Sequence, residues 1–170
     1  MRTALIVGVS GTALTADETA FLKDVRPAGF ILFTRNLQSH EQIRRLVADV
    51  RAAAGGHDML VLIDQEGGRV QRLRPPLGRA LPPAQAFAKL YGREPEAALA
   101  AAHAVARLMA EDLGALSINC DCVPVLDVPA PGAHDIIGNR AYGTTPEQVI
   151  ALGRAVADGM LAGGMLPVIK

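Results

Sequence analysis

The 170-residue sequence contains no tryptophan, and aromatic residues make up only 4% of it. Domains that bind nucleic acids usually combine an excess of basic residues with aromatic side chains on which bases can stack. Here 17 lysine and arginine residues are balanced by 17 acidic residues, so the formal net charge is zero. The composition therefore points away from nucleic acid and from an anionic membrane surface as partners.

Cysteine is nearly as scarce, since Cys120 and Cys122 are the only two. Alternating strand geometry would direct both side chains to the same face of a sheet, and we interpret them as core thiols rather than as a disulfide or a metal-binding pair. Free thiols are typical of reducing compartments, so a cytoplasmic location is expected. Histidines and acids do not cluster at metal-ligand spacing, so we expect no metal ion and no other cofactor.

Long apolar runs are also missing from the sequence. The first run, over residues 4–9, is too short to span a membrane. The acids and the lysine that follow it, together with the lack of a small-residue cleavage site, argue against a signal peptide. We therefore interpret this run as the first buried strand of a globular domain.

Half of the residues are apolar and 20% are charged, which is typical of one globular domain of ordinary size. Short apolar runs alternate with helical patterns along the chain, and this alternation predicts a parallel sheet with right-handed crossovers. Strands are expected over five ranges, 4–9, 29–33, 59–63, 117–125 and 166–169.

Three of the expected helices begin at a capping box, in which a hydroxyl group and a side chain three positions later satisfy free backbone amides. The three pairs are Thr15 with Glu18, Ser39 with Gln42, and Thr145 with Gln148. Two further helices are expected, one over residues 84–90 and one from Pro95 to a glycine cap at Gly114.

Two architectures fit this order, an open doubly wound sheet and part of a (β/α)8 barrel. The barrel is favoured because charged or amide groups stand near the C-terminal ends of the second to fifth strands, where barrel enzymes build their active sites. These residues are Arg35, Asn36, Asp64, Glu66, Asp127 and Lys170. A complete barrel usually needs roughly 250 residues, and the sequence stops within a strand. We therefore expect an α/β fold of the TIM type, with residues 1–170 forming the N-terminal part of a single barrel domain and holding about its first five strands.

The segment from Asp64 to Arg72 follows the third strand and mixes acidic, glycine and basic residues. Carboxylate and guanidinium groups present paired hydrogen-bonding atoms, so such a segment can bind the hydroxyl groups of a sugar. On chemistry alone, Asp64 suits either ligand binding or a structural ion pair, whereas Glu66 and Arg69 fit structural roles better. The glycine pair at 67–68 lacks the pattern of a phosphate-binding loop.

Residues 63–72, Ile-Asp-Gln-Glu-Gly-Gly-Arg-Val-Gln-Arg, resemble the signature of family 3 glycoside hydrolases, in the branch of bacterial β-N-acetylhexosaminidases. Supporting matches occur in order along the chain at Ile31–Asn36, Pro124–Val128 and Ile137–Tyr142. The terminal Pro167–Lys170 resembles the start of the family's Lys-His-Phe-Pro-Gly-His-Gly segment. The resemblance extends over essentially the whole chain.

This resemblance implies a TIM-like barrel that removes non-reducing terminal N-acetylglucosamine. Its substrates would be cell-wall fragments in which N-acetylglucosamine is linked to 1,6-anhydro-N-acetylmuramic acid, recycled in the cytoplasm. By their positions in the family motifs, four residues would contact the N-acetylglucosamine, namely Asp64, Arg72, Arg140 and Lys170. Lys170 is the last residue, and a terminal side chain is expected to fray.

The chemistry implied by the resemblance is retaining, through a covalent glycosyl-enzyme on a carboxylate, with a second group as acid and base. In this branch the nucleophilic aspartate and a histidine–aspartate pair lie beyond the equivalent of Lys170. We therefore expect no catalytic residue in this chain and no turnover by it. None of its four histidines matches the catalytic one. Surface positions are expected for His40, His57 and His103, and a position at the mouth of the site is open for His134 with Asp135.

Three other functions stay open at the level of sequence. A family 3 β-glucosidase would share the fold, and a sugar-binding half-barrel without catalysis would share the site. A doubly wound domain that binds phosphate or a nucleotide is disfavoured, because no glycine-rich loop joins a strand to a helix.

Overall fold

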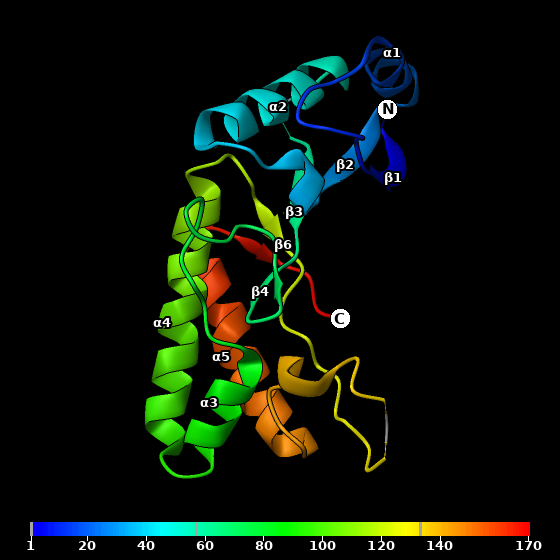
Figure 1. The fold of residues 1–170 in the computed structure, drawn as a ribbon. Coiled ribbons are helices and arrows are strands. Elements are labelled where there is room, and N and C mark those ends of the chain that lie inside the picture. Colours follow the sequence, from blue (N-terminus) through cyan, green and yellow to red (C-terminus); the bar gives the residue numbers. More distant parts are fainter. Residues whose placement is uncertain (1, 57, 133) are drawn as a thin grey trace.

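The structure of the protein, a computed structural model, describes residues 2–56, 58–132 and 134–170. Its main sheet has five parallel strands in the order β1-β2-β3-β6-β7 (Figure 1). The strands are β1 (Thr3–Val7), β2 (Pro27–Leu32), β3 (Leu60–Ile63), β6 (Cys120–Asp121) and β7 (Leu166–Pro167). The helices are α1 (Ala16–Val25), α2 (His40–Ala53), α3 (Ala84–Tyr91), α4 (Pro95–Gly114) and α5 (Pro146–Ala162). The predicted parallel α/β fold is confirmed.

The main core lies between the helices and one face of the sheet. Phe30 of β2 and Ile63 of β3 are fully buried there, in one cluster with Leu46 of α2 and Leu113 of α4. Apolar side chains at helical spacing supply one side of this core, and every second strand residue supplies the other.

The opposite face of the sheet carries a smaller cluster, made only of strand residues and their extensions. Leu62, Cys120 and Cys122 form it, with Val168 packed against them. Among the described residues, helices therefore cover one face alone, as in a barrel wall, whereas a doubly wound sheet needs helices on both faces. The two cysteines are free buried thiols on the same face, as predicted. Burial raises the pKa of Cys120 to about 12 and that of Cys122 to about 11, so neither is a ready nucleophile.

The fourth expected strand is much shorter than predicted, since only Cys120 and Asp121 of the range 117–125 pair as a strand. Ser117 has a φ of 63° in the turn that follows α4. The Asn119 side chain replaces part of the ladder, because its oxygen accepts the Val61 N–H at 2.7 Å. The apolar composition therefore predicts a buried segment correctly but overstates its regular pairing.

The prediction of a buried first strand is wrong. Leu5 and Ile6 of β1 are 47% and 51% exposed, and the whole strand has exposed or intermediate residues. Four of its five residues are apolar, but it lies at an edge of the sheet and, among the described strands, pairs only with β2. Apolar composition alone does not distinguish an edge strand from a central one.

The predicted helix starts are present, with one difference in their capping. Thr15 and Glu18 form the complete capping box. Ser39 caps α2 and Thr145 caps α5 in the same way, but their glutamine partners bond to the residue before the cap instead of to the cap itself. Gly114 is the last residue of α4, and Ala115 rather than the glycine is its cap.

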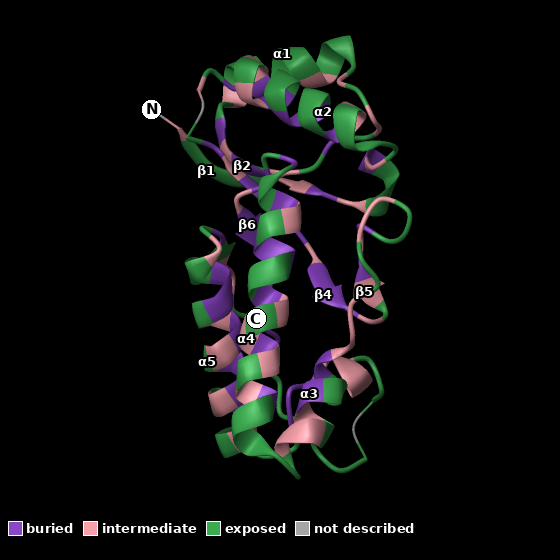
Figure 2. Ribbon diagram, turned by 90° about the vertical axis from the view of Figure 1, so that its left-hand side faces the viewer, coloured by how far each residue is buried: buried purple, intermediate pink, exposed green. Residues whose placement is uncertain are grey.

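A short hairpin stands apart from the main sheet, directly after β3. It consists of β4 (Gln65–Gly67) and β5 (Val70–Gln71), which pair antiparallel. Figure 2 shows β4 as buried, in contrast to the exposed outer faces of the helices. The two short helical turns are η1 (Thr34–Asn36) and η2 (Gly138–Arg140). No described helix is both long and apolar enough to cross a membrane.

Candidate functional site

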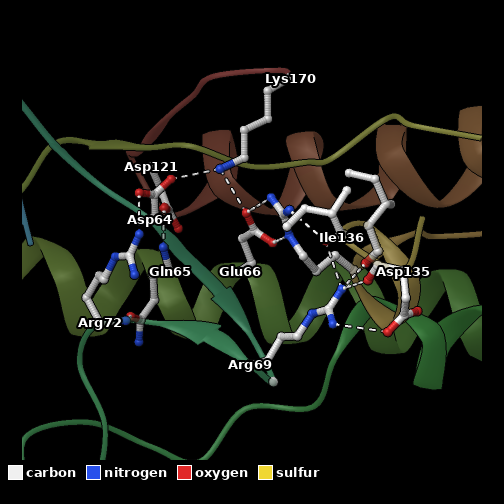
Figure 3. A network of polar contacts seen from close by, with 12 residues as sticks. Asp64, Gln65, Glu66, Arg69, Arg72, Asp121, Asp135, Ile136 and Lys170 are labelled. Atoms are coloured by element: carbon white, nitrogen blue, oxygen red, sulfur yellow. Dashed lines mark hydrogen bonds and ion pairs between the residues drawn. The ribbon is translucent and has the colours of Figure 1, made fainter. Parts of the chain in front are cut away.

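A cluster of charged side chains lies at the carboxyl end of the central strands, where β3 leads into the hairpin (Figure 3). We call it the strand-end cluster, and its members are Asp64, Glu66, Arg72, Arg140 and Lys170. In parallel strands the carboxyl ends lie along one edge, so residues far apart in sequence meet there. The cluster therefore contains all four residues that were predicted to bind the sugar. Its fifth member is Glu66, for which the sequence analysis predicts a structural role.

Asp64 follows the last residue of β3 and pairs with two cations. Its Oδ2 atom accepts a hydrogen bond from Arg72 Nη2 at 2.9 Å, and its Oδ1 atom accepts one from Lys170 Nζ at 2.8 Å. Its side chain is only 16% exposed. Each carboxylate oxygen thus has one cation partner and keeps further lone-pair capacity, which suits a group that receives hydroxyl donors.

Glu66 connects the other two cations. Its carboxylate receives a two-pronged contact from Arg140, at 2.7 Å from Nε and 2.8 Å from Nη2. Lys170 Nζ lies 2.8 Å from the Glu66 Oε1 atom as well, so the lysine bridges Glu66 and Asp64. With a side chain only 5% exposed, Glu66 is well placed to hold the cations and poorly placed to contact a ligand. This agrees with the structural role expected for it.

The glycine pair shapes the hairpin that carries these residues. Gly67 has a φ of 87° and Gly68 a φ of 57°, a region that favours glycine. A Cβ atom on Gly67 would collide with the carbonyl oxygen of Pro82. The turn sends the chain back so that Arg72 faces Asp64, with its guanidinium 5.7 Å from the centre of the Phe33 ring.

Arg140 reaches the cluster from the loop that follows β6. Arg69 anchors this loop, because its Nη2 atom donates to the carbonyl oxygens of Asp135, Ile136 and Ile137 at 2.6, 2.8 and 2.9 Å. The loop then turns through η2, which ends at Arg140. Arg69 therefore has the structural role expected for it.

Hydrogen bonds within the cluster favour the charged forms of Asp64, Arg140 and Lys170. Burial works against the ionised form of Asp64, but hydrogen bonds from Lys170 and Arg72 outweigh it and lower the pKa of this carboxyl. Burial also opposes the charge of Lys170, but its bonds to Asp64 and Glu66 raise the pKa of the ammonium group. The hydrogen bonds that Arg140 donates to the Glu66 carboxylate likewise raise the pKa of Arg140. The cluster is thus suited to bind a polar, uncharged ligand through fixed charges.

The backbone of Lys170 is hydrogen-bonded to the chain that follows β6. Its backbone N–H donates to the Pro124 carbonyl at 3.2 Å, and its own carbonyl accepts the Leu126 N–H at 2.6 Å. These bonds place the terminal side chain against both cluster acids. The ion pairs of Lys170 with Asp64 and Glu66 hold its side chain in place. The position of Lys170 at the end of the sequence does not predict these contacts.

Three of the charged or amide residues expected at the C-terminal ends of the strands do not belong to the cluster. Asn36 is fully buried and donates to the carbonyls of Val9 and Gly11, so it fastens the loop after β1. Arg35 stacks over Phe33 at 4.6 Å. Asp127 is exposed and forms no ion pair within 4.0 Å among the described residues. Fewer of the polar residues at the strand ends therefore gather in one cluster than the sequence predicts.

The histidines lie outside the cluster. His40 begins α2 and contacts the Leu77 carbonyl at 2.6 Å, and His134 is exposed beside Asp135. His103 lies on α4 and is half-buried rather than at the surface. The prediction for His57 lies outside the described residues. In the described part of the chain, no group of histidine, cysteine and acidic residues could hold a metal ion.

One buried acid beside the cluster escapes prediction from the sequence. Asp121 of β6 is fully buried, and its Oδ1 atom accepts the backbone N–H of Gln65 at 2.9 Å. Flanked by Cys120 and Cys122, it is easily taken for part of an apolar strand. The signal that could have found it is an ionisable residue at the centre of a strand that is otherwise apolar.

Known proteins have sequences similar to that of this chain. Residues 4–170 match the family model described as the glycosyl hydrolase family 3 N-terminal domain. A protein named beta-hexosaminidase from Methylococcus capsulatus is 46% identical over 160 residues, which cover 94% of this chain and 46% of the relative. For a beta-hexosaminidase from Xylella fastidiosa the identity is 43%, over 98% of this chain and 48% of the relative. The chain spans about half the length of the curated relatives it matches.

Solved structures give the same result. Native NagZ from Neisseria gonorrhoeae superposes on 99% of this chain and 49% of its own chain, with a TM-score of 0.92 at 34% identity. The same protein has been solved in complex with N-trifluoroacetyl-D-glucosamine. A family 3 beta-N-acetylglucosaminidase from a Paenibacillus strain superposes with a TM-score of 0.83 at 30% identity, over 97% of this chain and 31% of its own.

Proposed function

We propose, given that the chain belongs to glycosyl hydrolase family 3, that its strand-end cluster binds the terminal N-acetylglucosamine of a β-N-acetylhexosaminide. In this proposal Asp64 accepts hydrogen bonds from the sugar hydroxyls, while Arg72, Arg140 and Lys170 donate to hydroxyl or acetamide oxygens. The observation that carries the proposal is the arrangement around Asp64, an ionised acid held between Arg72 and Lys170 at the end of a central strand.

This arrangement suits a sugar for chemical reasons. Two neighbouring hydroxyl groups can donate to the two oxygens of one carboxylate, and flanking cations can donate to the hydroxyl oxygens in turn. Because Arg72 and Lys170 hold Asp64 in place, little side-chain freedom is lost when a ligand binds. The relative from Neisseria gonorrhoeae was solved with a glucosamine derivative, which supports the same ligand class here.

The proposed reaction of the whole enzyme is a retaining hydrolysis, in which a carboxylate attacks the sugar and a second group acts as acid and base. We place both of these groups outside the 170-residue chain. Asp64 and Glu66 are occupied by cation partners, and the pKa of Asp64 is lowered, so this carboxyl is a poor proton donor. Asp121 has no exposed surface and cannot touch a substrate without a rearrangement.

The proposed natural substrates are peptidoglycan fragments with N-acetylglucosamine linked to 1,6-anhydro-N-acetylmuramic acid, in cell-wall recycling in the cytoplasm. The relatives named beta-hexosaminidase support a β-hexosaminide as the broader substrate class. A family 3 β-glucosidase is the second candidate. The two differ in whether the sugar needs an acetamido group, so competition between glucose and N-acetylglucosamine separates them.

Calorimetric titration of the purified chain tests the proposal. We expect saturable binding of N-acetylglucosamine, weaker binding of glucose, and a loss of about tenfold or more in affinity for Asp64→Asn, since charged hydrogen bonds to a ligand contribute about 1.5–3 kcal/mol each. The matched control is Asp158→Asn, the same change at an exposed site on α5. Equal affinity for Asp64→Asn and the control would contradict the proposed site.

A hydrolysis assay tests the placement of the catalytic groups. The chain is expected to release no p-nitrophenol from p-nitrophenyl β-N-acetylglucosaminide above the level of the uncatalysed reaction. Measurable release that is lost in Asp64→Asn would show that the chain holds a catalytic carboxylate after all.

A further inference from the structure

Asp121 is an acid next to the strand-end cluster, and it has no cation partner within ion-pair distance among the described residues. It ends β6 and is in register with Ile63 of β3 and with Pro167 of β7, so it stands between the strands that carry Asp64 and Lys170. Figure 3 shows it beside Asp64 and Gln65. Its side chain is completely buried.

The two oxygens of this carboxyl group have different surroundings. Oδ1 accepts the backbone N–H of Gln65 at 2.9 Å. Oδ2 is buried and has no hydrogen-bond partner among the described residues. A buried acid with a free oxygen is costly when ionised, so its presence in the interior calls for an explanation in the structure around it.

Gln65 is the group that depends on Asp121. It lies between Asp64 and Glu66 in the chain, so the amide held by Asp121 belongs to the backbone that carries both cluster acids. The Gln65 side chain is buried as well, and its Oε1 atom accepts the backbone N–H groups of Arg72 and Leu73 at 3.1 and 3.0 Å. One continuous chain of hydrogen bonds therefore leads from Asp121 through Gln65 to Arg72.

We propose that Asp121 is a positioning residue for the strand-end cluster, which it supports by fixing the Gln65 amide and, through Gln65, the relative placement of Asp64, Glu66 and Arg72. It touches no ligand, and its effect passes through backbone geometry. The expected effect of Asp121 on sugar affinity rests on the proposed sugar-binding function. Its expected effect on the pKa of Asp64 does not depend on any ligand.

Burial disfavours the ionised form of Asp121. Burial raises the pKa of its carboxyl well above the ordinary value, against the opposing effects of the Gln65 amide and of Lys170. The pKa of Asp64 is lowered, so the surroundings shift the pKa values of these two neighbouring acids in opposite directions. The titratable groups that face Asp121 are Asp64 after β3, Lys170 after β7, Tyr142 before α5, and Cys120 and Cys122 beside it in the chain.

The test compares Asp121→Asn with Asp121→Ala in the 170-residue chain. Asparagine keeps an oxygen that can accept the Gln65 N–H and carries no charge, whereas alanine removes the acceptor. The readouts are the pKa of Asp64, from the carboxyl carbon resonance in NMR, and the affinity for N-acetylglucosamine. Asp158→Asn and Asp158→Ala on the surface of α5 are the matched controls.

We expect Asp121→Ala to raise the pKa of Asp64 towards its ordinary value and to weaken N-acetylglucosamine binding about tenfold, the scale of one lost buried hydrogen bond. Asp121→Asn should retain the low pKa of Asp64 and bind within about twofold of the unaltered chain, well below that scale. A purely structural role would lower the stability of Asp121→Ala but leave the pKa of Asp64 in the folded protein unchanged. That result, or equal losses in both variants, would overturn the proposal.

Two further outcomes have a defined meaning. If the unaltered chain binds no N-acetylglucosamine, the proposed function fails, while the pKa of Asp64 still decides the role of Asp121. If Asp121→Ala does not fold, Asp121→Asn decides it. Because the pKa of Asp121 is raised, the unaltered chain should lose stability relative to Asp121→Asn as pH rises from about 4 towards neutrality. A pH-independent difference, or a loss of the low pKa of Asp64 in Asp121→Asn, contradicts the proposal.

Discussion

The strand-end cluster and the outer faces of the helices use the same pairs of residue types in opposite surroundings. On α4, Arg107 and Glu111 stand four positions apart, and their side chains are 59% and 52% exposed. In the cluster, Arg140 and Glu66 are 74 positions apart, and theirs are 18% and 5% exposed. A pair of the first kind follows from helix geometry and contributes little, whereas a pair of the second kind requires the whole fold to bring it together.

The difference shows where the charges of this protein matter. Exposed pairs on a helix exchange freely with water, so losing one partner leaves the other solvated. In the cluster, losing one partner leaves a partly buried charge without compensation. Substitutions should therefore have very different effects in the two regions, although the side chains removed are the same.

The largest effect is expected for Glu66→Ala. Arg140 and Lys170 would both lose a carboxylate partner in a partly buried site, and we expect a loss of about 3 kcal/mol in the free energy of unfolding. Urea denaturation followed by circular dichroism measures it. A loss below about 0.5 kcal/mol, the usual limit for surface substitutions, would remove the distinction between the two regions.

A smaller loss of stability is expected for Asp64→Asn, about 1–2 kcal/mol. Lys170 keeps Glu66 as a partner, while Arg72 loses the one carboxylate that pairs with it among the described residues. The same denaturation experiment applies. A larger loss than that of Glu66→Ala would show that Asp64, rather than Glu66, is the centre of the cluster.

The contribution of Asp64 to the free energy of unfolding should decrease as the pH is lowered. The pKa of Asp64 is lowered in the folded state. The stability that this carboxyl contributes is therefore fully present above its unfolded-state pKa of about 3.9, and it is lost as pH falls through the folded-state pKa. The stability difference between the unaltered chain and Asp64→Asn should therefore shrink from pH 7 to pH 3. A difference that stays constant over this range would show that the pKa of Asp64 is not lowered.

The smallest effect is expected for Asp158→Ala on α5, which removes an exposed partner of Arg154. The free energy of unfolding should change by less than about 0.5 kcal/mol. Its sensitivity to salt should also be small, because exposed charges are already screened at physiological ionic strength. A loss comparable to that of Glu66→Ala would mean that exposure does not govern the value of these pairs.

Much of this organisation could be predicted from the sequence. The alternation of apolar runs and capped helices predicts the parallel sheet, and Asp64, Arg72, Arg140 and Lys170 stand at family motifs that the fold brings together. These features depend on local patterns, which a sequence displays directly.

The remaining features depend on distant contacts. The exposure of β1 follows from its place at the edge of the sheet. The placement of the Lys170 side chain follows from its ion pairs with two acids more than a hundred positions away. Asp121 matters because its neighbour across the sheet is the chain at Gln65, a contact that spans 56 positions. Neither residue type nor spacing displays such contacts.

The most direct test of the account is a titration of the isotope-labelled chain with N-acetylglucosamine, observed by amide NMR. Saturable shifts are predicted at residues 64–72 and at Arg140, while the amides of α1 and of the exposed face of α4 stay unchanged. The absence of saturable shifts, or shifts confined to the helices, would contradict the claim that the strand-end cluster binds the sugar.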